Sequence, residues 1–156
     1  MITRRHLILC SAAALGGCGR REDRNTSRAE FLPLYPNETP ELRRLINKYA
    51  DIHEIPASLL HRVIVRESTH NPAARNGPYY GLMQILPATA RTMGYRGAPE
   101  GLLDAETNLR YAGKYLRGAY LVAGGDEDAA VGWYARGYYY EAKRLGLLEE
   151  TGLRSG

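Results

Sequence analysis

Glu67 is the only acidic residue between Ile55 and Pro99, and it follows an apolar pattern of helical period. The pattern recurs about one turn apart at four positions, Leu59, Leu60, Val63 and Ile64. Seven residues at about 100° each carry this face from Leu60 to Glu67, so we expect the carboxyl on the apolar side of a helix that Pro56 opens. Loss of hydration there, and the partial negative charge of the helix C-terminus, both raise the pKa of a carboxyl. The sequence therefore predicts that Glu67 is a protonated acid.

A protonated carboxyl beside a groove suits cleavage of a glycosidic bond, because the leaving oxygen must gain a proton as the sugar becomes positively charged. Most glycosidases add a second carboxylate, and none lies in the segment around Glu67. Three more distant acids remain candidates for that second role, namely Asp104, Glu106 and Asp126. Twelve Tyr against one Trp and one Phe also favour a sugar ligand, although half-buried Tyr on helix surfaces would account for most of them.

Helix signals recur along the chain, and no segment alternates as a half-buried strand does. The expected helices run from Pro40 to about Ile52, from Pro56 to Glu67, from Pro87 to Met93, from Asp104 to about Val122, from Asp126 to Arg136 and from Tyr138 to Leu145. Thr39 and Asp104 are expected to cap their helices. We therefore predict one all-α domain at residues 41–146, followed by a C-terminal tail at residues 147–156.

Residues 1–17 have the pattern of a signal peptide. Two arginines precede an apolar run from Leu7 to Leu15, which is too short to span a bilayer. The tetrad Leu15-Gly16-Gly17-Cys18 resembles the lipobox of bacterial lipoproteins, in which the chain is cut before a cysteine that then carries lipid. We expect export to the periplasm or cell envelope, by the general or the twin-arginine route, and membrane anchoring through Cys18. An unmodified Cys18 thiol is the alternative.

Residues 18–40 are predicted to form a tether, because four arginines and three prolines stand among few apolar residues. The basic half suits an anionic membrane surface, and a solvated spacer is the alternative. Cleavage before Cys18 removes two arginines and no acid, which lowers the formal net charge from +4 to +2. This charge gives no reason to expect nucleic-acid binding. One cysteine remains in the mature chain, so no disulfide can form within it.

Three blocks of residues along the chain form a recognisable pattern. The first and most specific consists of Glu67-Ser68, Asn71-Pro72 and Gly81-Leu82-Met83-Gln84-Ile85, followed by Pro87 and Thr89-Ala90. The second and weaker block consists of Glu106, Asn108, Tyr115 and Leu116, and the third consists of Tyr134 and Gly137. In chain order, the three blocks cover about residues 42–145, and together they resemble the signature of the soluble lytic transglycosylase (SLT) family.

The resemblance implies a goose-type, lysozyme-like helical domain with a substrate groove, which cuts peptidoglycan between N-acetylmuramic acid and N-acetylglucosamine without hydrolysis. Glu67 would protonate the leaving oxygen and then take a proton from the C6 hydroxyl of the muramic acid, which closes a 1,6-anhydro ring. Tyr134 would hydrogen-bond Glu67. The residues that would position or bind the substrate are Ser68, Met83, Gln84 and Asn108. The resemblance implies no cofactor. Peptidoglycan is the expected partner, and the sequence leaves open whether the protein also works with an envelope machine.

Two departures from the family pattern bear on the site. His70 stands where the family has an aromatic or large apolar residue, and we expect it to pack there. Ala135 replaces the asparagine after Tyr134, and Arg136 follows it. This replacement weakens the third block, and we expect it to alter a sugar subsite. Two alternatives therefore stay open: a muramidase that uses water on the same fold, and a peptidoglycan-binding or envelope-assembly lipoprotein with a degenerate site.

Several of these residues also have structural interpretations. Ser68 suits a helix-end cap, Met83 alone would be taken as core, and Gln84 is equally expected to pair with backbone. Trp133 is expected in the core. The spacing from Glu67 to His70 matches half of a di-iron helix motif, but no second copy occurs, so we expect no metal site.

Overall fold

The structure, a computed structural model, describes residues 33–154, and the predicted signal peptide and Cys18 lie outside them. These residues belong to one compact unit. Its elements are α2 (Pro40–Ile52), α3 (Ala57–Ser68), β1 (Arg75–Asn76), β2 (Tyr79–Tyr80), α4 (Pro87–Thr92), the 3-10 helix η1 (Pro99–Leu103), α5 (Ala105–Val122), α6 (Glu127–Arg136) and α7 (Tyr139–Leu145). Among residues 33–154, no helix combines the length and apolar character needed to cross a membrane.

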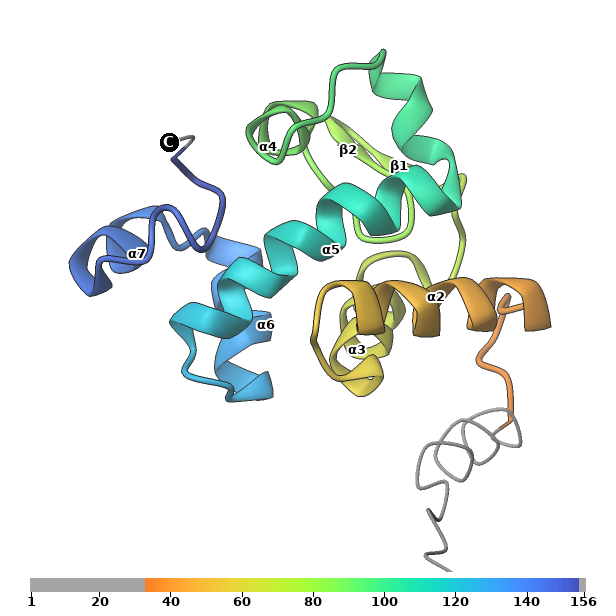
Figure 1. The fold of residues 1–156 in the computed structure, drawn as a ribbon. Helices are drawn as coiled ribbons and strands as arrows, with labels where there is room; N and C mark the ends of the chain where they lie inside the picture. Colours follow the sequence, from red (N-terminus) through yellow and green to blue (C-terminus); the bar gives the residue numbers. More distant parts are fainter. Residues whose placement is uncertain (1–32, 155–156) are drawn as a thin grey trace, which may run out of the picture. The chain divides into compact units, whose positions relative to one another are not determined.

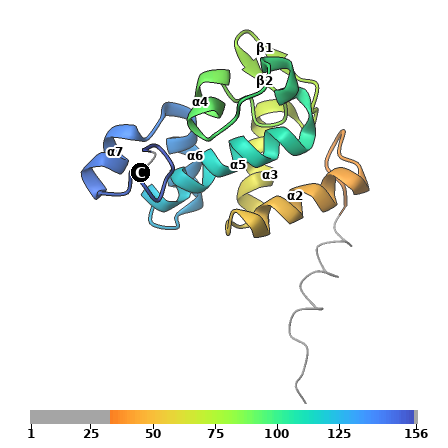
Figure 2. The ribbon, with the colours of Figure 1, turned by 45° about the horizontal axis from the view of Figure 1, so that its top comes forward.

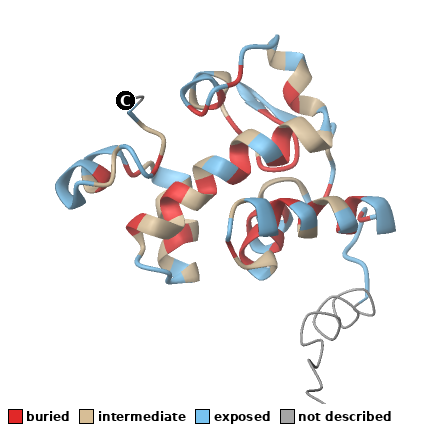
Figure 3. Ribbon diagram, in the orientation of Figure 1, coloured by how far each residue is buried: buried red, intermediate tan, exposed pale blue. Residues whose placement is uncertain are grey.

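Helix α5 runs through the middle of the unit, with α2 and α3 on one side and the hairpin and α4 on the other (Figure 1 and Figure 2). It packs against α2, α4, α6, α7 and η1. Its inward face repeats at three- and four-residue steps, through Leu109, Ala112, Leu116 and Ala119, all of which are fully buried. Figure 3 shows this buried stripe along α5 and the matching buried faces of α2 and α3.

Local signals at the helix ends act as the sequence predicts. The side chain of Thr39 accepts a hydrogen bond from the Leu42 N–H at the start of α2. Asp104 and Asp126 cap α5 and α6 in the same way. Each such cap stabilises its helix by about 0.5–2 kcal/mol, because it pairs a backbone donor that has no partner within the helix. The bounds of the predicted helices are confirmed to within one or two residues.

Three short elements, β1, β2 and η1, were not predicted from the sequence. Strands β1 and β2 pair antiparallel across the turn at Gly77, so the expectation that no segment forms a strand is wrong for these four residues. A strand of two residues is too short to produce an alternating pattern, and the turn between them sets the pairing. The 3-10 helix η1 likewise follows Pro99 without an apolar period of its own.

Both ends of the folded unit extend further than the sequence predicts. Glu38 is buried and Tyr35 stacks on two buried histidines, so part of the predicted tether at residues 18–40, from Tyr35 onward, contacts the folded unit. At the other end, Thr151 is 2% exposed and three leucines pack on the core, namely Leu147, Leu148 and Leu153. Residues 147–153 therefore belong to the domain and are not a free tail.

Candidate active site

Glu67 lies in the last turn of α3. The helix ends directly after Ser68, where Thr69 and His70 both adopt left-handed backbone angles, with φ of 51° and 61°. The Glu67 side chain is 24% exposed, and Arg66 Nε lies 3.6 Å from its Oε1. Burial raises the pKa of Glu67, and the positive charge of Arg66 opposes this only in part. The expected direction of the Glu67 pKa is therefore confirmed.

Asn108, from α5, holds the loop at residues 81–84. Its side-chain oxygen accepts a hydrogen bond from Met83 N at 3.0 Å, and its side-chain nitrogen donates to the carbonyls of Tyr80 and Leu102 at 2.9 and 2.8 Å. The side chain is fully buried. The predicted contact between Asn108 and substrate is therefore corrected, because its hydrogen-bonding groups are all committed to backbone that they hold in place.

Two unusual backbone conformations shape the same loop. Gly81 has a φ of 76°, and a Cβ there would overlap the Asn108 side chain, so this position requires glycine on both counts. Gln84 has a φ of 49°, which is uncommon for a residue with a side chain. Its amide nitrogen donates to the carbonyls of Ala74 and Gly81 at 3.1 and 2.8 Å, and these bonds hold the turn closed.

The loop fastens directly onto the helix that carries Glu67. The Ser68 hydroxyl donates a hydrogen bond to the Leu82 carbonyl at 2.8 Å, which joins the end of α3 to the loop. The Met83 side chain is fully buried, so the prediction that it lines the groove is corrected: the turn directs it into the core and leaves its carbonyl facing α6.

Tyr134, from α6, meets this loop at Met83. Its hydroxyl donates a hydrogen bond to the Met83 carbonyl at 2.8 Å, so its proton is not directed to Glu67, and the predicted bond between the two side chains stays a prediction in which Tyr134 would be the acceptor. The charge of Glu67 nevertheless reaches Tyr134. Burial first and then this charge raise the pKa of Tyr134 well above its ordinary value. A tyrosine hydroxyl has one proton, so towards any other neighbour this oxygen offers only lone pairs.

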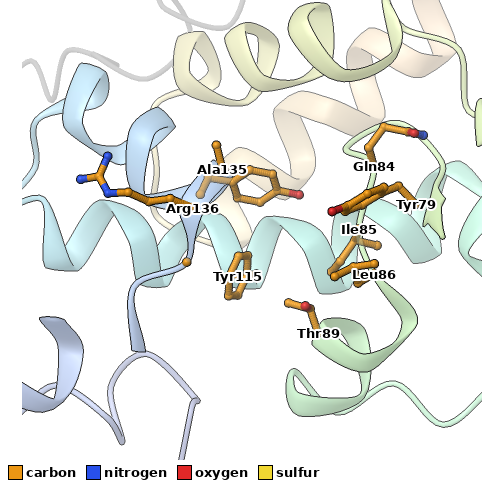
Figure 4. A pocket seen from close by; sticks show the side chains of 10 residues that line it. Tyr79, Gln84, Ile85, Leu86, Thr89, Tyr115, Ala135 and Arg136 are labelled. Atoms are coloured by element: carbon orange, nitrogen blue, oxygen red, sulfur yellow. The ribbon is translucent and has the colours of Figure 1, made fainter. Parts of the chain in front are cut away.

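A hollow of about 220 Å³ opens at the surface beside Tyr134. Figure 4 shows Tyr79, Gln84 and Leu86 along one side, and Ala135 and Arg136 along the opposite side. Its complete lining is Tyr79, Gln84, Ile85, Leu86, Thr89, Tyr115, Tyr134, Ala135, Arg136 and Gly137. We call it the first hollow. Gln84 and Tyr134 are the predicted site residues that it brings together, and Glu67 is close enough for its charge to raise the pKa of Tyr134.

Residues 44–146 match the sequence profile of the Transglycosylase SLT domain family. The chain belongs to this family. Among solved structures it is similar to the crystal structure of the 70 kDa soluble lytic transglycosylase SLT70 from Escherichia coli, with 30% sequence identity and a TM-score of 0.57. The match covers 69% of this chain and 19% of that protein, so the chain spans only a small part of the length of SLT70. The all-α, lysozyme-like SLT fold expected from the sequence is thereby confirmed.

The three acids that the sequence left as second carboxylates have other partners in this SLT domain. Asp104 and Asp126 cap α5 and α6. Glu106 accepts hydrogen bonds from Lys48 at 2.7 Å and from the Tyr49 hydroxyl at 3.1 Å. None of the three lines the first hollow, and its lining contains no acidic residue. Glu67 does not line the hollow either, but its charge acts on Tyr134, which does.

One cluster of the described residues has the composition of a metal site. Ligand atoms of Glu38, His61 and His70 all lie within 4.8 Å of one another, and all three residues are buried. However, Arg43 donates to both carboxylate oxygens of Glu38, and its positive charge disfavours a cation beside it. His61 Nδ1 and His70 Nε2 are also paired directly, at 3.0 Å. We therefore interpret the cluster as a hydrogen-bond network that supports the end of α3.

Several residues of the site were not selected from the sequence. Tyr79 and Thr89 line the first hollow without belonging to a predicted set of binding residues. The high Tyr content was the signal for Tyr79, since a tyrosine suits a sugar groove. Arg136 was noticed only as a departure from the family pattern. The partnership of Glu38 with the two histidines had no sequence signal, because contacts across 23 or more positions leave no local pattern.

Proposed function

We propose that this chain is a peptidoglycan lytic transglycosylase, which cleaves the bond between N-acetylmuramic acid and N-acetylglucosamine and leaves 1,6-anhydro-muramic acid ends. The observation that carries the proposal is the state of Glu67. It is a half-buried carboxyl with a raised pKa, its charge acts on Tyr134, and Tyr134 lines a hollow that contains no acidic residue. A single acid of this kind suits a reaction in which one group serves first as acid and then as base.

In the first step, the protonated Glu67 gives its proton to the glycosidic oxygen, and the bond from that oxygen to C1 of the muramic acid breaks. The departing N-acetylglucosamine leaves with a hydroxyl, and the muramic acid becomes a positively charged oxocarbenium ion. In the second step, the C6 hydroxyl of the same sugar attacks C1 and passes its proton to the Glu67 carboxylate. Glu67 ends protonated and ready for another cycle. The nucleophile is part of the substrate, so positioning replaces the activation of water.

Tyr134 supports the acid form of Glu67 in this scheme. Its only proton is committed to the Met83 carbonyl, so it can accept a hydrogen bond from a protonated Glu67 but cannot donate one to the carboxylate. A hydrogen bond accepted from the protonated carboxyl would favour that state, in the same direction as burial. Tyr134 is therefore a positioning residue, and Gln84, at the edge of the first hollow, is the predicted binding residue best placed to meet the sugar.

Product analysis tests the proposal. Purified sacculi are digested with the wild-type protein and with Glu67→Gln, and the soluble muropeptides are separated and weighed by mass spectrometry. We expect 1,6-anhydro-muramic acid ends from the wild type and no products from the variant, because an amide can act neither as acid nor as base. The variant should unfold at the same temperature as the wild type or slightly higher, since it loses a carboxyl that the fold disfavours.

The same digestion separates the alternatives. Reducing muramic acid ends would identify a muramidase that uses water. Binding to sacculi without soluble products would identify the degenerate binding protein. Anhydro products from a folded Glu67→Gln protein would overturn the role assigned to Glu67.

We further propose that the protein is exported and held at the envelope by lipid on Cys18, which would keep the domain near its substrate. The support is the lipobox-like tetrad before Cys18, which lies outside the described residues. Intact-mass measurement of the protein extracted from membranes tests this. We expect a mature chain that begins at Cys18 and carries acyl groups. We also expect the Cys18→Ala variant to be released into the soluble fraction. A chain that keeps residues 1–17, or an unmodified Cys18, would contradict it.

A further inference from the structure

A second hollow adjoins the first at the end of α6. It has a volume of about 470 Å³ and shares Arg136 and Gly137 with the first hollow. Its full lining is Trp133, Arg136, Gly137, Tyr138, Tyr139, Tyr140, Glu141 and Arg144. In Figure 4 the Arg136 side chain extends from the edge of the first hollow away from Tyr79 and Gln84. Arg136 therefore stands at the junction, where one ligand can contact both hollows.

The guanidinium of Arg136 is placed by its own helix. It lies over the ring of Trp133, with 3.8 Å between Cζ and the ring centre. Gly132 leaves the space for this arrangement, because a Cβ there would lie 2.8 Å from Arg136 Nη1. Trp133, expected in the core, is only partly buried and presents this face to the arginine. Stacking covers one face of the guanidinium and leaves the N–H groups along its edge free to form hydrogen bonds.

The charge of Arg136 is not neutralised within residues 33–154, where it forms no ion pair. Glu141 is the one acid that lines the second hollow, and Arg144 already holds both of its oxygens, one of them at 2.8 Å. The hollow therefore carries a surplus positive charge. A planar, stacked guanidinium with a free edge is the geometry that binds a carboxylate through two parallel hydrogen bonds.

We propose that Arg136 binds a carboxylate of the peptide that hangs from the glycan strand, while the strand itself occupies the first hollow. This inference rests on the proposed function. The sugars of a peptide-bearing strand are uncharged, whereas its stem peptides carry free carboxylates, so the peptide is the part of the substrate that complements Arg136. The exposed rings of Tyr139 and Tyr140, at 49% and 84%, flank the position with apolar surface for the rest of the peptide.

Binding experiments in a Glu67→Gln background test the inference without turnover. Soluble strands that keep their peptides are titrated into Glu67→Gln and into the double variant that adds Arg136→Gln. We expect the Kd of the double variant to be roughly 5- to 20-fold higher, because it loses charge-assisted hydrogen bonds whose strength is reduced by exposure to solvent. The same titration with strands stripped of peptides by an amidase should show no difference between the two proteins. Lys143→Gln removes one exposed charge from α7 outside both hollows, and it should keep the Kd of the background.

Three results would overturn the inference. One is an unchanged Kd for peptide-bearing strands in Arg136→Gln. Another is an equal loss of affinity for stripped strands, which would assign Arg136 to the carboxylate of the bare muramic acid side chain. The third is an equal loss in Lys143→Gln, which would mean a general charge effect. Because the readout is binding, Arg136-dependent affinity for the peptide would stand even if the wild type formed no anhydro products and the proposed function failed.

Discussion

Tyr134 and Glu67 come from different helices, and the Met83 carbonyl, which accepts the Tyr134 proton, decides what the tyrosine can do. Because the hydroxyl donates to that carbonyl, α6 is tied to the loop at residues 81–84. Burial first and then the charge of Glu67 raise the pKa of the hydroxyl well above its ordinary value, so the hydroxyl keeps the proton of this bond at neutral pH. The motif placed Tyr134 near the acid, but the bond to Met83, 51 positions away, could not be predicted because a hydroxyl proton rotates to whichever acceptor the fold provides.

Tyr134→Phe should therefore lower both activity and stability. Turnover should fall roughly 10- to 1000-fold, as for loss of one positioning hydrogen bond in an active site. The free energy of unfolding should fall by about 1–3 kcal/mol, because the Met83 carbonyl loses its donor. Turnover on soluble strands and unfolding in urea measure the two effects. Tyr120→Phe, on α5 and outside both hollows, is the matched control; equal turnover in Tyr134→Phe and the wild type would make the hydroxyl dispensable.

At the scale of elements, the helices were predictable and the loop was not. Thr39, Asp104 and Asp126 cap helices through bonds to residues three positions away, so short-range sequence contains the whole signal. The loop at residues 81–84 depends on Asn108, which contacts it across 25 or more positions. For this reason Asn108 looked like a binding residue in the motif, although its amide holds backbone inside the core.

Asn108→Ala should open this loop. It removes the partners of the Met83 N–H and the Leu102 carbonyl, while the Tyr80 carbonyl keeps its bond from the Ile85 N–H, so we expect the free energy of unfolding to fall by about 2–5 kcal/mol. Activity should fall as well, since the Met83 carbonyl that receives Tyr134 is part of the same loop. Urea unfolding and hydrogen exchange of the Met83 amide measure the change. Asn76→Ala, on the exposed strand β1, serves as the control, and a similar small loss in both variants would show that other contacts hold the loop.

At the scale of the whole folded unit, residues 33–38 are fastened to the helix that carries the acid. Tyr35 stacks on His70, with 4.9 Å between ring centres, and Asn37 Nδ2 donates to the Thr69 carbonyl at 3.0 Å. His70 is fully buried, which confirms that it packs where the family has an aromatic residue. Its Nδ1 has no partner among the described residues. The packing of His70 could be predicted from the sequence, but its polar partners could not, because those come from distant segments.

This network predicts that the domain loses stability in acid. Burial lowers the pKa of His61 to about 4 and lowers that of His70, against an ordinary value of 6.5. Glu38 faces His61 and favours its charged form, but Arg43 and the second histidine oppose this. As the pH falls below about 6.5, the histidines become protonated in the unfolded chain but stay neutral in the folded protein. The free energy of unfolding therefore decreases until His61 is protonated in the folded protein as well. Glu67 acts in the opposite direction, because its pKa is raised in the folded state.

Urea unfolding between pH 7.5 and 4.5 measures this dependence, in the wild type and in His70→Phe. The phenylalanine restores an aromatic side chain and removes one buried group that would have to accept a proton, so stability should fall less steeply with acid than in the wild type. It also removes the unpaired Nδ1, which should raise stability at neutral pH unless the lost bond to His61 outweighs it. If both proteins lost stability equally between pH 6.5 and 4.5, His70 would not contribute to the acid response, and the titration would belong to His61 or to groups elsewhere in the domain.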